Sequence, residues 1–151
     1  MPKIVVSDTS CFIALTNIGE LSLLQKLYTH LFTTEDVADE FGESLPDWVE
    51  VLSPTDKQKQ QLLEFQIDRG EASAIALALE ISADAIILDD YKARIAAEKL
   101  GLEVTGTLGI IIKSKNQGII DSIKPILEKL QKTNFRLSNQ LIAEAIRLAG
   151  E

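Results

Sequence analysis

Carboxylates follow two apolar segments that have the composition of buried strands. Asp89 and Asp90 come directly after the aliphatic run at residues 85–88, and Asp8 ends the first aliphatic run, at residues 3–7. One aspartate in such a place can cap the next helix. Two adjacent like charges repel and are costly to remove from water, so the pair needs a compensating partner. A metal ion is the simplest such partner.

The elements that must position these acids alternate along the chain. Strands are predicted at residues 3–10, 30–34, 48–52, 83–90 and 102–107. Helices are predicted at residues 12–18, 21–28, 35–43, 57–67, 71–82, 91–101, 108–118, 122–133 and 138–151. This alternation indicates an α/β fold in three layers, α/β/α, with a central parallel sheet and helices on both faces. We expect one domain over residues 1–151, closed by C-terminal helices within residues 113–151.

The predicted topology brings more acids to the same place. In an open parallel sheet, ligands bind beyond the carboxyl ends of the strands. Glu40 lies on the helix after the second strand, and Glu71 opens the Ala-rich helix that leads into the Asp89–Asp90 strand. The acids expected at one crevice are therefore Asp8, Glu40, Glu71, Asp89 and Asp90. Such an all-oxygen set selects Mg²⁺ or Mn²⁺ and suits phosphodiester hydrolysis without a covalent nucleophile.

Each acid also has a structural explanation. Asp8, followed by Thr9 and Ser10, has the position of a helix N-cap. Glu71 stands three residues after Asp68, which is the spacing of a capping box. Glu40 can be a solvated helix residue. The cysteine and the histidine offer no alternative chemistry, because we expect Cys11 to be a buried small apolar residue and His30 to be structural.

Composition restricts the class of protein. The 151 residues are 46% apolar with a net charge of −8, which argues against passive, charge-driven binding to nucleic acid. Residues 113–151 nevertheless carry 7 Lys and Arg against 4 acids, so a basic tail can meet an anionic partner. A single cysteine suits a reducing compartment. With no leader-like segment and no run of eighteen apolar residues, we expect a soluble cytoplasmic protein without membrane contact.

Four segments together resemble the PIN-domain ribonucleases, and most closely a toxin-like, uncharacterised prokaryotic branch. These segments are VVSDTSCFIAL, TTEDVADEF, DRGEASAIALAL and AIILDDYKARIAAEKLGLEVTGTLGIIIKSKNQGII, and the resemblance covers residues 3–125. It implies a Mg²⁺- or Mn²⁺-dependent ribonuclease, often the toxin of a toxin–antitoxin pair with an antitoxin partner, and often a homodimer. Family members carry metal-binding acids at the positions of Asp8, Glu40, Glu71 and Asp90, with a hydroxyl at Ser10.

The fourth acidic segment departs from the family pattern. Many members have Thr or Ser where this chain has Leu88, two positions before Asp90. We expect Asp90 to be the direct ligand and Asp89 to support it, because neighbouring side chains of an extended segment point to opposite sides. We expect RNA contacts from the basic residues Arg94, Lys113 and Lys115.

Three other classes of protein also place acids at strand ends. One is a non-catalytic PIN-like module that binds RNA or a protein. A receiver-like phosphoacceptor is a second, although receivers carry paired acids after the first strand, where this chain has only Asp8. A haloacid-dehalogenase phosphatase needs a second aspartate at the position of Ser10.

Overall fold

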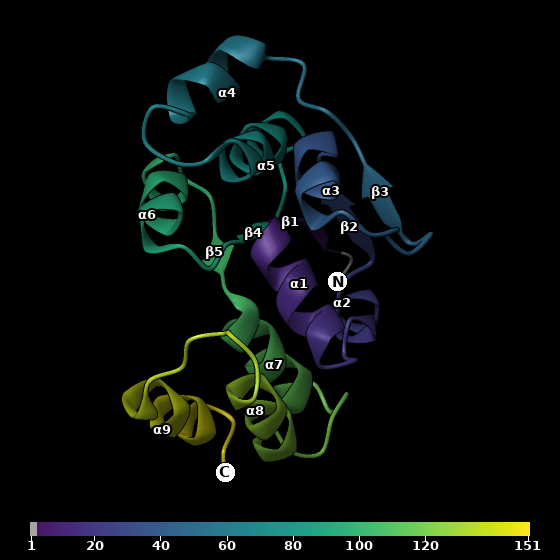
Figure 1. Ribbon diagram of the computed structural model, residues 1–151, viewed down its shortest axis with the longest axis vertical. Coiled ribbons are helices and arrows are strands. Elements are labelled where there is room, and N and C mark those ends of the chain that lie inside the picture. Colours follow the sequence, from purple (N-terminus) through teal and green to yellow (C-terminus); the bar gives the residue numbers. More distant parts are fainter. Residues whose placement is uncertain (1–2) are drawn as a thin grey trace.

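Five parallel strands form a single sheet in the order β3-β2-β1-β4-β5. The computed structural model describes residues 3–151 (Figure 1). Strand β1 (Ile4–Ser7) is central, β2 (His30–Thr33) and β4 (Ala85–Ile87) flank it, and β3 (Val49–Val51) and β5 (Val104–Thr105) are the edges. All the pairings between neighbouring strands are parallel, which confirms the predicted sheet.

The sheet is buried on both faces, as its continuous aliphatic strands require. Val5 belongs to one apolar cluster and Val6 to another, and Ile87 and Ile86 divide in the same way. Successive side chains of a strand point to opposite faces, so these two clusters are the two sides of the sheet. The predicted helices on both faces are therefore confirmed.

Nine helices connect and cover the strands within residues 3–151. They are α1 (Thr9–Asn17), α2 (Ser22–Leu27), α3 (Glu35–Phe41), α4 (Lys57–Leu63), α5 (Arg69–Glu80), α6 (Tyr91–Lys99), α7 (Thr107–Asn116), α8 (Lys124–Gln131) and α9 (Asn139–Leu148). Residues of α1, α2 and α7 line one apolar cluster, and residues of α5 and α6 line the other. None of these helices is long and apolar enough to cross a bilayer.

Helix α4 is shorter than predicted. We expected a helix from Lys57 to about Ile67, but α4 ends at Leu63 and the chain turns over the next three residues. The turn leaves Phe65 87% exposed and places Ile67 in the cluster beneath α5. The predicted continuation over four more residues was wrong, because the chain turns after Leu63 and buries Ile67 against α5.

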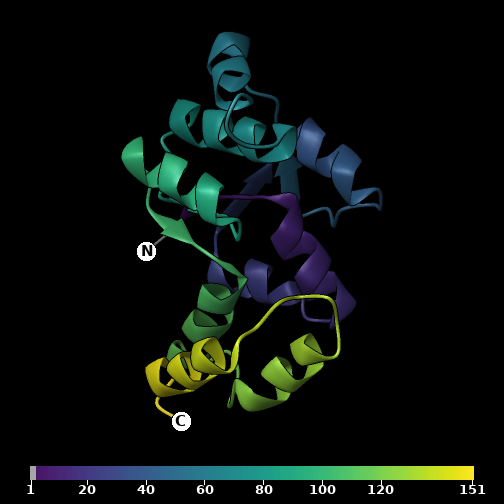
Figure 2. The same cartoon turned by 60° about the vertical axis from the view of Figure 1, so that its left-hand side comes forward.

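Helices α7, α8 and α9 lie together below the sheet (Figure 1). Ile110, Ile126 and Ala145 join the same apolar cluster as Leu15 and Leu23 of the N-terminal helices. The connection between α8 and α9 rises from this lower part toward the end of α1 (Figure 2). The basic tail is thus packed onto the body of the protein, and one of its loops faces the carboxyl edge of the sheet.

Candidate functional site

Helix N-termini gather at the carboxyl edge of the sheet. Helices α1, α6 and α7 begin directly after the neighbouring strands β1, β4 and β5. The first turn of each helix has backbone N–H groups without a partner inside the helix, and carboxylates accept from them. Asp8 accepts from the N–H of Cys11 at 3.2 Å, and Asp90 accepts from that of Ala93 at 3.1 Å. Both predicted cap positions are therefore occupied by acids.

The adjacent aspartates cap two different helices. Whereas Asp90 caps α6, Asp89 accepts from the backbone N–H of Thr107 at 2.8 Å and from its hydroxyl at 2.6 Å. Thr107 is the first residue of α7, whose own N-cap is Gly106 and has no side chain. A Cβ at Gly106 would lie 2.9 Å from Oδ1 of Asp89. Because Gly106 has no side chain, the carboxylate of Asp89 can approach the N-terminus of α7 and cap it in place of the N-cap residue.

Asp8 is the buried acid of the site, with only 2% of its surface exposed. Burial and the negative charge of Asp89 raise the pKa of the Asp8 carboxyl well above its usual range, and the charge of Glu71 adds to this. Hydrogen bonds from the backbone of Cys11 and Asp89 oppose the rise. Among residues 3–151, no Lys or Arg lies within ion-pair distance of Asp8. Asp8 is therefore a buried carboxyl without a Lys or Arg partner in this part of the chain.

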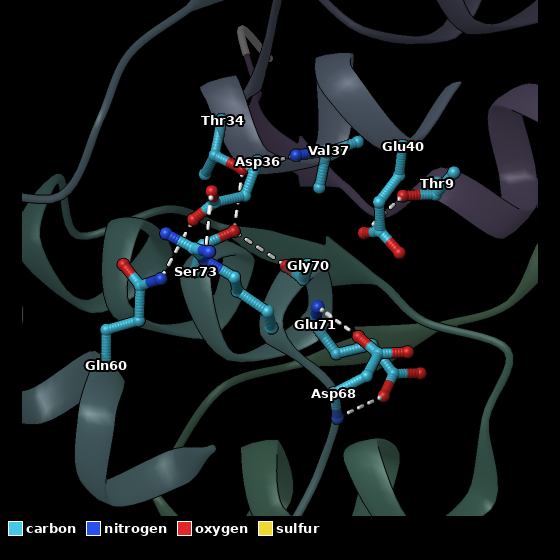
Figure 3. Close-up of polar contacts among 11 residues, drawn as sticks. Thr9, Thr34, Asp36, Val37, Glu40, Gln60, Asp68, Gly70, Glu71 and Ser73 are labelled. Carbon is cyan, nitrogen blue, oxygen red and sulfur yellow. Dashed lines mark hydrogen bonds and ion pairs between the residues drawn. The ribbon is translucent and has the colours of Figure 1, made fainter. Parts of the chain in front are cut away.

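Glu71 lies at the start of α5 in a capping box with Asp68 (Figure 3). Asp68 accepts from the N–H of Glu71 at 2.8 Å, and Glu71 accepts from the N–H of Asp68 at 3.3 Å. Burial, together with the charges of Asp68 and Asp90, raises the pKa of Glu71 to about 7. Glu71 can therefore hold or release a proton near neutral pH.

Glu40 approaches the site from α3. Its Oε1 accepts from the hydroxyl of Thr9 at 3.1 Å, and its side chain extends toward Gly70 (Figure 3). Partial burial and the charges of Asp68 and Asp36 raise its pKa, whereas the Thr9 bond lowers it. Glu40 thus lies between Thr9, which follows Asp8, and Gly70, which precedes Glu71.

A cleft of about 1040 Å³ opens beside these acids. Its acidic side is lined by Asp68, Glu71, Asp89 and Asp90, and Ser10 also lines it. Two arginines border the same cleft: Arg94, whose guanidinium donates to the carbonyl of Leu88 at 3.2 Å, and Arg136 of the α8–α9 connection. The remaining walls are largely apolar and include Ile13, Tyr91, Leu108, Phe135, Leu137 and Leu141.

Some of the predicted site residues line the cleft and others do not. Ser10, Glu71, Asp89, Asp90 and Arg94 line the cleft. Asp8 is buried, with the charge of Asp89 acting on it, and Glu40 does not line the cleft but lies against Gly70.

Two predicted RNA contacts lie elsewhere. Lys115 donates to the carbonyl of Ala149 at 2.9 Å and pairs with Glu151, so it anchors the end of α9. Lys113 is partly buried, and burial and the charge of Lys3 lower its pKa. Neither lysine lines the cleft.

Sequence reasoning missed several residues of the site. Gly106 and Thr107, at the junction of β5 and α7, and Arg136, in the α8–α9 connection, were not singled out. Arg136 belongs to the basic tail, but the sequence does not show which basic residue of the tail lines the cleft. Asp68 was read only as a capping residue, and the structure shows it at the cleft as well.

The donors suit a hard divalent cation in their chemistry. Asp8 and Asp89 offer oxygen atoms only, and Asp8 has no basic partner in the described part of the chain. The acids do not form a ready cluster, however, because within residues 3–151 no three His, Cys, Asp or Glu side chains are placed to share one ion. Among the neighbouring charges, that of Asp89 raises the pKa of Asp8 most.

Fold and site together define a class of α/β protein with a parallel sheet in the order 3-2-1-4-5 and carboxylates at its carboxyl edge. A more specific assignment comes from sequence comparison. The chain belongs to the PIN-domain family DUF3368, whose family model, described as a PIN domain, matches residues 4–151. This confirms the resemblance found in the sequence. PIN domains typically bind divalent metals, and the family includes nucleases. None of the curated proteins matches this sequence.

The raised pKa of Glu71 predicts a pH-dependent stability in the metal-free protein. A carboxyl whose pKa rises from 4.5 to about 7 on folding stabilises the fold below pH 4.5, and this contribution is lost as the pH rises through 7. Glu71→Gln keeps the capping acceptor without the titration. In EDTA, the Tm of the wild type minus that of Glu71→Gln should therefore fall between about pH 5 and pH 8. A constant or rising difference would contradict the assignment, and Glu98→Gln, an exposed control, should show no such trend.

Proposed function

We propose that this protein is a divalent-metal-dependent endoribonuclease that cleaves single-stranded RNA. The observation that carries the proposal is the buried Asp8 carboxyl, which has no basic partner in the described residues and whose pKa is raised by burial and by the charge of Asp89, a residue that lines a large cleft. A buried acid in this state costs stability, so a cation that binds there is favoured. Membership of the PIN-domain family supports the same class of chemistry.

The residues have distinct roles in this proposal. Asp8 and Asp89 would hold Mg²⁺ or Mn²⁺, with Glu71, Asp90 and Glu40 as further acids. A bound ion of this kind polarises a water and neutralises charge on the scissile phosphate. Glu71, whose pKa is about 7, would accept the proton of the attacking water. Arg94 would donate to a phosphate oxygen from the cleft wall.

Arg136 and the apolar walls support an extended, unpaired substrate. Arg136 of the α8–α9 connection lines the same cleft as Glu71 and Asp90. Tyr91 is 75% exposed at the cleft, and Phe135 lines it as well. Aromatic rings that line a groove with basic residues are a common support for single strands, because every base has a face that can stack.

A second candidate is a non-catalytic PIN-like module that binds RNA or a protein. The absence of a ready three-acid cluster among residues 3–151 favours it. Incubation with Mn²⁺ and a set of labelled single-stranded RNAs separates the two functions. Binding without cleavage in any of them would support the module.

Asp8→Asn should abolish cleavage without loss of stability. Asparagine still accepts from the N–H of Cys11 as an N-cap, and it removes a buried charge that Asp89 repels. We expect no Mn²⁺-dependent cleavage and, in EDTA, a Tm equal to or above that of the wild type. Asp121→Asn makes the same charge change at an exposed position and should cleave normally. A variant of Asp8 that unfolds at room temperature would show that its role is structural.

Asp89→Asn should weaken Mn²⁺ binding more than Asp90→Asn does. From the sequence we expected the reverse order. The charge of Asp89 raises the pKa of Asp8, whereas that of Asp90 raises the pKa of Glu71, and this supports Asp89 as the ligand that acts with Asp8. Titration calorimetry with Mn²⁺ measures both variants. A larger loss in Asp90→Asn would restore Asp90 as the direct ligand and leave Asp89 as the cap of α7.

Arg136→Ala should weaken RNA binding in a salt-dependent way. Loss of one phosphate contact to a single strand lowers the slope of log K against log salt by about 0.7. Fluorescence anisotropy with Asp8→Asn as the cleavage-deficient background measures this slope. Lys132→Ala is the matched control, because Lys132 belongs to the same basic tail and is exposed outside the cleft. Equal slopes in the two variants would remove Arg136 from the RNA path.

A further inference from the structure

Gly70 lies directly beneath the carboxylate of Glu40. A Cβ built on Gly70 would lie 1.7 Å from Oε1 of Glu40 and 2.8 Å from its Cδ, so the carboxylate occupies the space that any other side chain would fill (Figure 3). The φ angle of Gly70 is not positive, so its backbone accepts an L residue. The glycine is therefore required for the close approach of Glu40 and not for the conformation of the chain.

A buried hydroxyl chain fixes the two helices that make this approach. The hydroxyl oxygens of Thr34 and Ser73 lie 2.6 Å apart, and both side chains are fully buried. Ser73 donates to the carbonyl of Gly70 at 2.7 Å, so Thr34 is the donor to Ser73. Thr34 in turn accepts from the N–H of Val37 at 3.1 Å. The chain of bonds joins the first turn of α3 to the first turn of α5, at the residue beneath Glu40.

A second bond fixes the carboxylate itself. The hydroxyl of Thr9 donates to Oε1 of Glu40 at 3.1 Å, and this is the oxygen that lies nearest to Gly70. Thr9 follows Asp8, and Gly70 precedes Glu71. The position of Glu40 relative to these two acids is thus set by one residue adjacent to each of them.

We propose that Gly70 and the Thr34–Ser73 pair are positioning residues that hold Glu40 at the acidic site. Gly70 provides the space, and the Thr34–Ser73 bond sets α3 against α5 so that the carboxylate reaches it. This inference rests on the proposed function, since it gives Glu40 a supporting place in metal binding. Groups that orient metal ligands from behind typically change metal affinity by 10- to 100-fold when they are removed.

Gly70→Ala is the most selective test. The added methyl displaces only the end of a flexible side chain, and alanine is the better helix former. We expect the metal-free Tm to stay equal or rise, while Mn²⁺ affinity by titration calorimetry falls about tenfold. A structural role for Gly70 alone would instead lower the Tm and leave the affinity unchanged.

Ser73→Ala tests the hydroxyl chain against a matched control. Ser114 is equally buried, and its hydroxyl donates to the carbonyl of Ile110 within α7, as that of Ser73 does to Gly70 within α5. Only Ser73 also bonds to a second helix. Ser73→Ala should lose more stability than Ser114→Ala, because it also leaves the buried Thr34 hydroxyl without its acceptor. Only Ser73→Ala should lose Mn²⁺ affinity. Thr34→Ser, which keeps the hydroxyl, should retain the affinity of the wild type.

The outcomes separate this inference from the proposed function. If the wild type neither binds Mn²⁺ nor cleaves RNA, the proposed function fails. If the wild type binds Mn²⁺ and Glu40→Gln binds it equally well, Glu40 is not part of the site and the positioning proposal is overturned. Unchanged affinity in both Gly70→Ala and Ser73→Ala would overturn it too. Loss of affinity in these variants and in Glu40→Gln, with a retained Tm in Gly70→Ala, would support it.

Discussion

The structure depends on the meeting of helix N-termini at the carboxyl edge of a parallel sheet. Helices α1, α6 and α7 start from adjacent strands, and α5 starts beside them. Each of these N-termini presents unpaired N–H groups and a partial positive charge. Asp8, Asp68, Asp89 and Asp90 accept from them. Carboxylates are therefore the side chains that complete the fold here, and the sheet topology forces them together.

At this edge, each carboxylate stabilises the helix that it caps, but the carboxylates together repel one another. Each cap stabilises its own helix by about 1 kcal/mol. The assembled carboxylates repel, and burial makes their charges costly, which is why the pKa values of Asp8, Glu40 and Glu71 are raised. Capping thus explains where the acids lie, and it leaves a surplus of negative charge that a cation relieves. The structural and the functional explanations of these residues are two consequences of one arrangement.

The fold was largely predictable because its signals are local. The aliphatic runs at β1 and β4 and the cap Asp68 lie where the sequence placed them. The site was only partly predictable, because its contacts join distant segments. The bond between Asp89 and Thr107 and the contact between Glu40 and Gly70 depend on helix packing, which spacing along the chain does not encode. Leu88 illustrates the same limit: it is fully buried in the cluster with α5 and α6, so its apolar character serves packing there.

The most direct measurement of the central claim is the anomalous diffraction of crystals of the wild-type protein soaked in Mn²⁺. The account predicts a strong anomalous peak between Asp8 and Asp89, at the edge of the cleft and within bonding distance of carboxylate oxygens from both residues. Such a peak would establish that the acids gathered by the helix N-termini form a cation site. A peak elsewhere on the molecule, or none at saturating Mn²⁺, would contradict this and leave the carboxylates as helix caps alone.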